Sequence, residues 1–362
     1  MPELFEPVRV GAWTLRNRIV MAPMTRNRAT PSGVPTEDMA RYYGQRATAG
    51  LIITEGTQPS PAGQGYMNTP GLHTPQQRAG WARVAEAVHE GGGLVVGQLM
   101  HVGRISHPDN KHGAETVAPS ALAAPGTVFT AGGPKPHAVP RALRTEELPS
   151  VAREFADAAT AARTAGLDGV ELHAANGYLL HQFLSPSANH RDDAYGGDPE
   201  ARSRFVVDVV RAVAEAVGPD RVGVRVSPGV ALHGIQGDDP HETAVTHEAL
   251  VDALSRLGVA YLHMIGDPAE PLLSGLRSRF HGPTVVSTGW EPVTNADDAT
   301  GLVRRGLADL VAVGRPYIAN PDLVRRWRTG GPLNQPDPAT FYGGGAAGYT
   351  DYPALGAGAG TG

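Results

Sequence analysis

The sequence predicts an α/β protein in which eight parallel strands close into a (β/α)₈, or TIM, barrel. Short apolar runs rich in β-branched residues recur along the chain, and most are followed by an Ala-rich helical pattern. Several of these runs are continuously apolar, as expected of strands that are covered on both faces. No G-x-G-x-x-G motif follows the first strand, which favours a closed barrel over an open doubly wound sheet.

The expected strands and helices alternate along the chain in the order that a barrel requires. We expect strands at 19–21, 51–55, 94–99, 169–173, 222–226, 261–265, 284–287 and 310–313. Helical patterns occupy 37–49, 75–89, 146–165, 201–217, 247–257, 295–305 and 321–329. The helix that starts at Asn295 has a good N-cap residue, and the charges of Asp297 and Asp298 suit the positive end of its dipole.

One long segment interrupts this alternation. Residues 100–146 are dense in Gly, Pro and His and are too long for a simple connection in a compact domain. We therefore expect them to form a lid or subdomain, a long insertion after the third strand of a single barrel domain that spans 1–353. The Ala- and Gly-rich residues 354–362 have too little apolar surface to become ordered, so we expect a flexible tail.

Composition argues against several classes of protein. The chain is 41% hydrophobic, and no apolar run reaches the roughly 18 residues that a membrane helix needs, so we expect no membrane partner. The net charge of −5 argues against nucleic acid, because phosphate backbones are bound by clustered Lys and Arg. The absence of Cys excludes disulfides, thiolate nucleophiles and cysteine-bound clusters or zinc. No secretory signal follows Met1, so we expect a cytoplasmic protein.

Barrel enzymes carry their function at the C-terminal ends of the strands, and this chain places many polar or small residues there. The candidates, in chain order, are Pro23, Met24, Thr25, Glu55, Gly56, Gln98, His101, His173, Asn176, Tyr178, Arg225, His263, Ser287, Gly289, Gly314 and Arg315. Arg225 is a charge within the apolar strand V-G-V-R-V, and its burial demands an anionic or strongly accepting partner. That partner is either a carboxylate in a structural salt bridge or the electron-rich part of a bound ring.

Two further features suit a bound heterocycle with a phosphate. Gln98 lies in a buried strand and offers both a donor and an acceptor to the edge of a ring, although it could equally be a satisfied core amide. The turns Ser287-Thr288-Gly289 and Val313-Gly314-Arg315 follow strands seven and eight, where barrels commonly bind phosphate. Small residues let backbone N–H groups approach phosphate oxygens, and an Arg can bind them bidentately.

The segment His173-Ala174-Ala175-Asn176-Gly177-Tyr178 places three polar side chains just after the fourth strand. They can point into one pocket and form a catalytic group. A metal site is the alternative, because the chain contains other histidines that could join such a cluster: His101, His107, His112, His181 and His263. The residues alone therefore leave open a metal-dependent or phosphosugar lyase or isomerase.

Six spaced motifs resemble those of the Old Yellow Enzyme flavoproteins, and the resemblance runs from about residue 4 to residue 353. The motifs lie at 17–26, 97–104, 173–186, 195–197, 312–316 and 341–345. The resemblance implies FMN across the barrel mouth, with NADPH or NADH as the reductant. It assigns the FMN contacts to Pro23, Met24, Thr25, Gly56, Gln98, Arg225, Gly289, Val313, Gly314 and Arg315.

The same resemblance implies an ene-reductase that acts on small α,β-unsaturated carbonyl or nitro compounds. His173 and Asn176 would bind the substrate oxygen, and Tyr178 would protonate the α-carbon. Tyr66, Met100 and Tyr342 would line the substrate pocket, Met100 standing where some relatives have Trp. Thr25 in place of Cys suggests the Thr-bearing branch of the family. The expected partners are small molecules, no metal is expected, and the chain would be a monomer or a homodimer.

Overall fold

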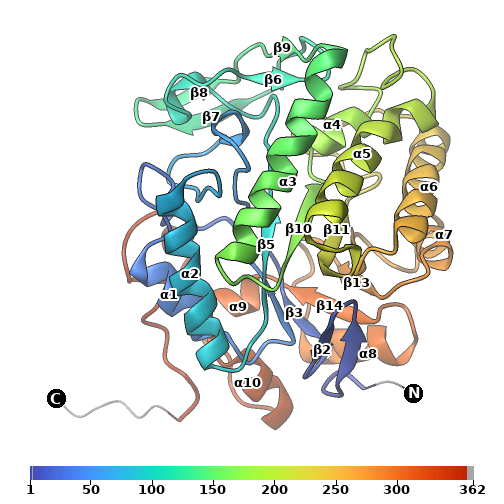
Figure 1. Cartoon of the computed structure of the whole chain (residues 1–362). Helices are drawn as coiled ribbons and strands as arrows, with labels where there is room; N and C mark the ends of the chain where they lie inside the picture. The colour runs from blue at the N-terminus through green and yellow to red at the C-terminus, as the bar shows by residue number, and fades with distance from the viewer. Residues whose placement is uncertain (2, 357–362) are drawn as a thin grey trace.

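Eight parallel strands form a closed barrel in the computed structural model, which describes residues 1 and 3–356 (Figure 1). Each strand pairs with the next along the chain, and the last pairs with the first. The barrel strands are β3 (Ile19–Met21), β4 (Leu51–Ile53), β5 (Val95–Leu99), β10 (Gly169–Ala174), β11 (Val222–Val226), β12 (Tyr261–Ile265), β13 (Thr284–Ser287) and β14 (Leu310–Val313). The predicted barrel is confirmed, with strand ends that differ from the prediction by no more than two residues.

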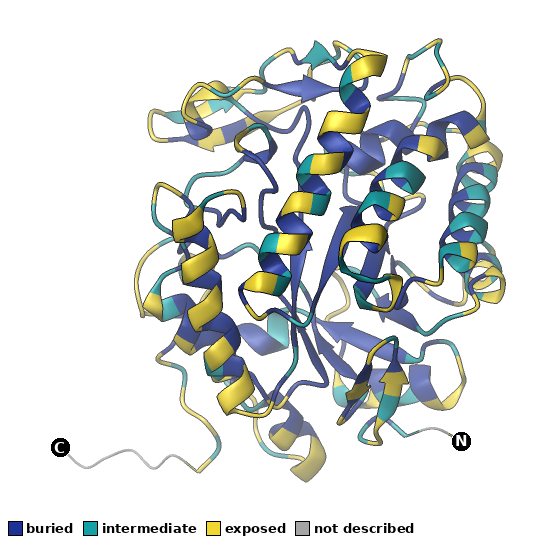
Figure 2. Ribbon diagram, in the orientation of Figure 1, coloured by how far each residue is buried: buried dark blue, intermediate teal, exposed yellow. Residues whose placement is uncertain are grey.

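Helices cover the outside of the barrel, and their solvent-facing sides are exposed while their inner sides are buried (Figure 2). The predicted helices correspond to α1 (Glu37–Gly44), α2 (Pro75–Glu90), α3 (Leu148–Thr164), α5 (Pro199–Val217), α6 (Pro240–Leu257), α8 (Ala296–Arg304) and α10 (Leu323–Thr329). Three short helices were not predicted: α4 (Leu179–Leu184), α7 (Pro271–Arg279) and α9 (Arg315–Ala319). Single turns of 3₁₀ helix lie at Pro61–Gly63, Pro108–Asn110, Thr145–Glu147, Pro219–Arg221 and Pro338–Thr340.

Two helix boundaries differ clearly from the prediction. α6 begins at Pro240 instead of 247, because the Asp239 side chain accepts hydrogen bonds from the backbone N–H groups of His241 and Glu242 and caps the helix. α1 ends at Gly44 instead of 49, since the following residues turn the chain into β4. The predicted cap at Asn295 is confirmed and forms a capping box with Asp298.

The lower interior of the barrel is an apolar plug. An N-terminal hairpin of β1 (Val8–Val10) and β2 (Trp13–Leu15), which was not predicted, packs against barrel side chains such as Leu51 and Val285. A Cβ atom at Gly169 would lie 2.7 Å from the Trp13 ring, so the strand needs a glycine where the tryptophan packs. Water is excluded from this end, which leaves the opposite end of the barrel for polar groups.

The segment 100–146 lies at the C-terminal end of the barrel strands, at the top of Figure 1. It contains the pair β6 (Val117–Ala118) and β9 (Arg141–Ala142) and the hairpin β7 (Thr127–Thr130) and β8 (Gly133–Pro136). Arg191 holds it in place, donating to the carbonyl oxygens of Pro119 and Leu143. The role of this segment as a lid stays a prediction.

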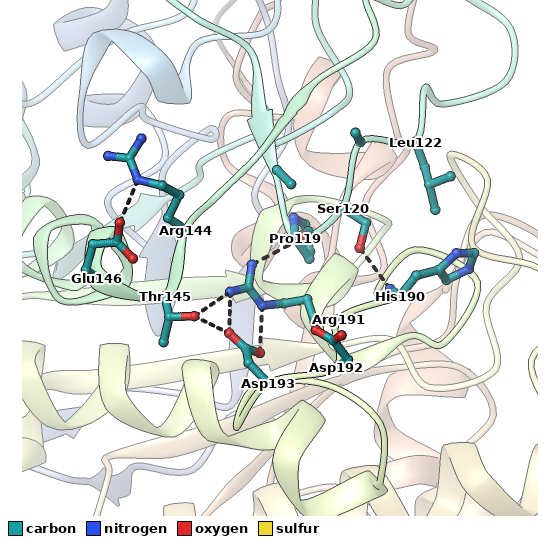
Figure 3. Close-up of a pocket in the computed structure, with 12 residues that line it drawn as sticks. Pro119, Ser120, Leu122, Arg144, Thr145, Glu146, His190, Arg191, Asp192 and Asp193 are labelled. Carbon is teal, nitrogen blue, oxygen red and sulfur yellow. Dashed lines mark hydrogen bonds and ion pairs between the residues drawn. The ribbon is translucent and has the colours of Figure 1, made fainter.

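Figure 3 shows the surface pocket around Arg191. The guanidinium also bonds Asp193 through Nε (3.0 Å) and Nη2 (2.5 Å), and Nη2 lies 3.2 Å from Thr145 Oγ1. Because the donors of Arg191 are bonded to the protein itself, this side chain holds the segment 100–146 in place and is not available to a ligand.

The C-terminal segment contacts the barrel through two stacked tyrosine rings, with one arginine packed against the outer side of each ring. The rings of Tyr349 and Tyr42 stack with centroids 4.0 Å apart. The guanidinium carbon of Arg28 lies 4.3 Å from the Tyr349 centroid, and that of Arg46 lies 3.7 Å from the Tyr42 centroid. Of the predicted flexible tail, 357–362 lie outside the described residues. Within the described part of the chain no helix has the length and apolar character to cross a membrane.

Candidate active site

The upper interior of the barrel is polar because paired residues on neighbouring strands point inward together. Gln98 on β5 lies opposite Glu171 on β10, and His173, two residues further along β10, lies opposite Arg225 on β11. Arg225 in turn lies opposite His263 on β12. Side chains at i and i+2 of a strand share a face, so Glu171 and His173 form two successive polar levels above the apolar plug.

Glu171 is the centre of this group, and sequence reasoning missed it. Its Oε1 accepts a hydrogen bond from Gln98 Nε2 (2.8 Å), and its Oε2 accepts one from His263 Nδ1 (2.9 Å). Burial alone would raise the pKa of Glu171, but His263, Arg225 and Gln98 outweigh it and hold that pKa below its ordinary value. The signal was present: Glu171 is a lone acid in the apolar strand G-V-E-L-H-A, as Arg225 is a lone base in V-G-V-R-V.

Arg225 is buried, and its Nε has no hydrogen-bond partner among the described residues. No carboxylate within the described chain lies close enough to form an ion pair with it, so the structural salt bridge considered above is not formed. Burial lowers the pKa of Arg225 and Glu171 opposes that shift, which leaves the guanidinium charged. A buried cation without a bonded acceptor is costly, so this position fits a ligand that carries electron density or negative charge.

His173 is held as a neutral hydrogen-bond donor. Its Nδ1 accepts a hydrogen bond from the backbone N–H of Ala175 (3.3 Å), so the ring proton is on Nε2. Burial lowers the pKa of His173 far below its usual value, and the nearby charge of Arg225 acts in the same direction. The imidazole therefore offers an N–H group whose protonation does not change near neutral pH.

Asn176 sits on a tight turn that leads from β10 into α4. Its φ of +57° and that of Gly177, +79°, are left-handed, and a Cβ at Gly177 would lie 2.8 Å from the Cβ of His233. The Asn176 N–H donates to Ser227 Oγ (2.8 Å), and its carbonyl accepts from His233 Nδ1 (2.7 Å). The side-chain Oδ1 is buried without a partner among the described residues, and no hydrogen bond from Nδ2 is formed within them, so the amide has not been used up by the protein.

Tyr178 follows directly and turns its hydroxyl toward Tyr66, with 3.0 Å between the two oxygens. Its ring lies edge-on to His173 at 4.9 Å between centroids and packs beside His233 at 5.3 Å. Burial raises the pKa of Tyr178 well above 10, as do Tyr66 and Tyr342 to a lesser degree, so the phenol keeps its proton. The His173 and Tyr178 rings thus pack together with Asn176 on the turn between them, and their joint role as a catalytic group stays a prediction. His233 was not predicted.

An apolar wall faces these groups and contains two of the predicted substrate residues. Met100 packs in a cluster with Tyr66 and Tyr178, together with Val102, Ile105 and Ala124 from the segment 100–146. A Cβ at Gly56 would lie 2.5 Å from Met100 Cε, so the small residue after β4 makes room for the methionine. Tyr342 is 70% exposed and is close enough to Tyr66 and Tyr178 to contribute to the raised pKa of both.

The remaining predicted FMN contacts lie beside β3, β13 and β14. Pro23, Met24 and Thr25 form a half-buried extended segment after β3, next to Val313, whose carbonyl accepts from the N–H of Ala22. Gly289 has a φ of +98° and open space where a Cβ would stand, which suits close approach of a phosphate. Gly314 lies at the end of β14, with Met24 packed beside it.

Arg315 is not free in this structure. Its side chain, 41% exposed, forms an ion pair with Glu291 from the loop after β13. Glu291 was not predicted to take part in the site, and its carboxylate competes with any phosphate for the guanidinium. Only Nη1 of Arg315 is bonded to Glu291, so the carboxylate lowers the affinity of Arg315 for an anion without occupying all of its donors.

The histidines that suggested a metal site are used separately. His107 lies next to Asp109, His112 Nε2 lies 3.1 Å from the carbonyl of Pro31, and His181 Nδ1 accepts from the N–H of Gly177. Within the described residues no group of three or more His, Asp or Glu side chains is placed to hold a metal ion.

The family model described as the NADH:flavin oxidoreductase / NADH oxidase family matches residues 3–334. The chain belongs to this family. It is the family of the Old Yellow Enzymes, so the chain is an NAD(P)H-dependent flavin oxidoreductase whose cofactor is FMN. The unpartnered Arg225 and the open space at Gly289 fit that cofactor, which has an electron-rich ring and a phosphate.

Relatives from distant organisms cover nearly the whole chain. A probable flavin mononucleotide-dependent alkene reductase of Leishmania infantum is 40% identical over 97% of both chains. A rice protein, 12-oxophytodienoate reductase 1, is 40% identical over 97% of this chain and 93% of its own. Among solved structures, morphinone reductase in complex with tetrahydroNAD has a TM-score of 0.92 and 46% identity over 98% of both chains. The Old Yellow Enzyme homologue of Zymomonas mobilis has a TM-score of 0.92 and 42% identity, over 98% of this chain and 100% of its own.

Proposed function

We propose that this Old Yellow Enzyme is an ene-reductase, which uses NADPH or NADH to reduce the activated C=C bond of α,β-unsaturated carbonyl or nitro compounds. When bound, FMN would supply the redox chemistry of this reaction, which is hydride transfer between the nicotinamide and the β-carbon of the alkene. One proton from the protein completes the saturated product. The observation that carries the proposal is the contact of a neutral donor, His173, with a protonated phenol, Tyr178, at the C-terminal end of β10, where Asn176 lies on the turn between them.

His173 and Asn176 are proposed to bind the substrate oxygen. Negative charge grows on that oxygen as the β-carbon receives hydride, so N–H groups aimed at it stabilise the transition state more than the ground state. The neutral imidazole and the amide donate without losing or gaining protons. Each donor in comparable sites contributes roughly 10²–10³ in rate.

Tyr178 is proposed as the general acid. Its buried hydroxyl keeps its proton at neutral pH and lies beside the binding groups. The bond to Tyr66 OH orients the hydroxyl and gives the developing phenolate a donor, so Tyr66 supports the transfer to the α-carbon. Met100, Tyr66 and Tyr342 are proposed to shape the space for the substrate chain, with Val102, Ile105 and Ala124 of the segment 100–146 as its outer wall.

FMN is proposed to be held across the upper level of the barrel. Arg225 would meet the electron-rich part of its ring, Gln98 would bind the edge of the ring through its amide, and Thr25 would donate to another ring oxygen. Pro23, Met24 and Gly56 would pack against the ring, and Gly289, Val313, Gly314 and Arg315 would hold the phosphate. Arg315 would then exchange Glu291 for the phosphate. We further propose that 1–353 act as one domain with 100–146 as its lid.

An anaerobic reaction in two separate steps tests the function. The FMN-loaded protein is first reduced by NADPH or by NADH and then mixed with 2-cyclohexenone or a nitroalkene, while flavin absorbance is followed. We expect bleaching by one nicotinamide, return of absorbance with the alkene, and one saturated product per flavin. Return of absorbance with oxygen but with no activated alkene would contradict the ene-reductase proposal and favour an NADH oxidase.

A further inference from the structure

Glu171 has no role in the reaction described above, yet it occupies the centre of the polar interior. The side chain is fully buried, and both carboxylate oxygens are bonded to side chains from other strands. A buried carboxylate is expensive to keep charged, so such a residue is retained only where its charge or its bonds matter. It bonds Gln98 and acts on the charge of Arg225, and these are two of the residues proposed to meet the flavin ring.

The first effect of Glu171 is on the orientation of an amide. A carboxylate only accepts hydrogen bonds, so Gln98 must turn its Nε2 toward Glu171, and its Oε1 must face away. Without that bond the amide of Gln98 could flip and exchange its donor for its acceptor. Gln98 is fixed on its other side through its backbone N–H, which donates to Thr54 Oγ1 (3.1 Å). Glu171 therefore determines that the Oε1 atom of Gln98, and not its Nε2 atom, points away from the carboxylate toward a ligand.

The second effect is on charge. Glu171 and Arg225 lie on adjacent strands and influence each other, but no ion pair joins them within the described residues, and the carboxylate oxygens are bonded to Gln98 and His263 instead. The carboxylate thus offsets part of the positive field of Arg225 while leaving the guanidinium donors to a ligand. Removal of this negative charge makes the top of the barrel more positive, which favours the electron-rich, reduced form of a bound flavin over the oxidised form.

We propose that Glu171 is a positioning residue that holds down the reduction potential of the bound FMN, by orienting Gln98 and by partly offsetting Arg225. The proposal rests on the placement of the flavin against Gln98 and Arg225 given under the proposed function. Arg225 and Glu171 then act on the reduction potential in opposite directions. The positive charge of Arg225 raises the potential and favours the reduced flavin, and the negative charge of Glu171 lowers it, so that the reduced flavin can still donate its hydride.

The test compares Glu171→Gln, which removes the charge at nearly constant volume, with Glu171→Asp, which keeps it. The measurements are the midpoint potential of the FMN-loaded protein and the dissociation constant of oxidised FMN. For E171Q we expect reduced FMN to be favoured by at least about tenfold over oxidised FMN relative to the parent protein, a positive shift of about 30 mV for a two-electron couple. For E171D we expect a potential close to that of the parent protein.

A third variant keeps the proposal testable if E171Q does not fold. His263→Leu removes one of the two donors that keep the carboxylate charged, so the potential should move in the same direction as in E171Q. A folded, FMN-loaded E171Q with the potential of the parent protein overturns the inference, as does an equal shift in E171D.

Arg225→Ala separates failure of the inference from failure of the proposed site. If Arg225→Ala lowers the potential or weakens FMN binding while E171Q changes neither, only the role of Glu171 is wrong. If neither variant changes the potential or the binding, the flavin does not lie against this part of the barrel.

Discussion

Replacing Tyr178 by phenylalanine removes one oxygen atom from the proposed site and leaves the ring that packs against His173 and His233. Among the described residues the lost hydroxyl is bonded to Tyr66 alone, at 3.0 Å. Because the ring stays, the pocket should keep its shape. The variant therefore measures the effect of losing the hydroxyl proton without a change in the packing of the ring.

The size of the effect follows from the environment of the hydroxyl. A positioned general acid contributes about 10²–10⁴ in rate, or roughly 3–5 kcal/mol of activation free energy. The hydroxyl of Tyr178 is buried and keeps its proton, which suits an acid that acts late, on a carbon that has become basic. The cost in folding free energy is small, about 1 kcal/mol for one lost hydrogen bond to the half-buried Tyr66.

Anaerobic stopped-flow measurements separate the two halves of the reaction. In Tyr178→Phe, flavin reduction by the nicotinamide should proceed at the parent rate, whereas reoxidation by 2-cyclohexenone should slow by at least about 10². Tyr66→Phe is the matched control: it removes the same hydrogen bond from the other side and keeps the acid, so its reoxidation should slow far less. Equal reoxidation rates for Tyr178→Phe and the parent protein would refute the assignment of Tyr178.

Four other variants test the remaining parts of the site. In His173→Ala, the oxidised protein should bind phenol at least about tenfold more weakly, as for the loss of one charge-assisted hydrogen bond, and the charge-transfer band of the complex measures this binding. Asn176→Ala should weaken phenol binding too. A normal charge-transfer band in either variant contradicts the role proposed for that residue. In Glu291→Gln, which frees Arg315 from its half-exposed ion pair, FMN should bind about fivefold more tightly, as for a pair worth about 1 kcal/mol; unchanged FMN binding by fluorescence titration would mean that Arg315 does not contact the phosphate. In Glu55→Gln, pH dependence is the readout, because burial raises the pKa of Glu55 to about 7. The folded state then binds the extra proton between about pH 4.5 and 7, so the parent protein loses stability as pH rises through that window, by about 3 kcal/mol at most. Urea unfolding at pH 5 and pH 8 should show that loss in the parent and not in the variant.

The strands were predictable because each carries its own local signal. A continuous apolar run such as 310–313 marks a buried parallel strand without reference to the rest of the chain, and the cap at Asn295 marks a helix start in the same way. The N-terminal hairpin was missed for the opposite reason. Its strands are three residues long, and what stabilises them is the packing of Trp13 against Gly169, far away in the sequence.

The same distinction holds for the candidate site: some of its features follow from the local sequence, and others depend on the tertiary structure. Spacing alone placed Asn176 and Tyr178 beside His173, because a few residues after one strand cannot lie far apart. The partners of these residues depend on which strands pair and in which register, and no local pattern states that. In the closed barrel, Glu171 lies between Gln98 and His263 and bonds both. The folded chain also brings the Tyr66 hydroxyl to that of Tyr178 and pairs Arg315 with Glu291. The sequence by itself therefore determined the barrel and the residue types at its mouth. The tertiary structure decided which buried charges are balanced, because the cost of a buried charge depends on the atoms around it and not on its neighbours in the chain.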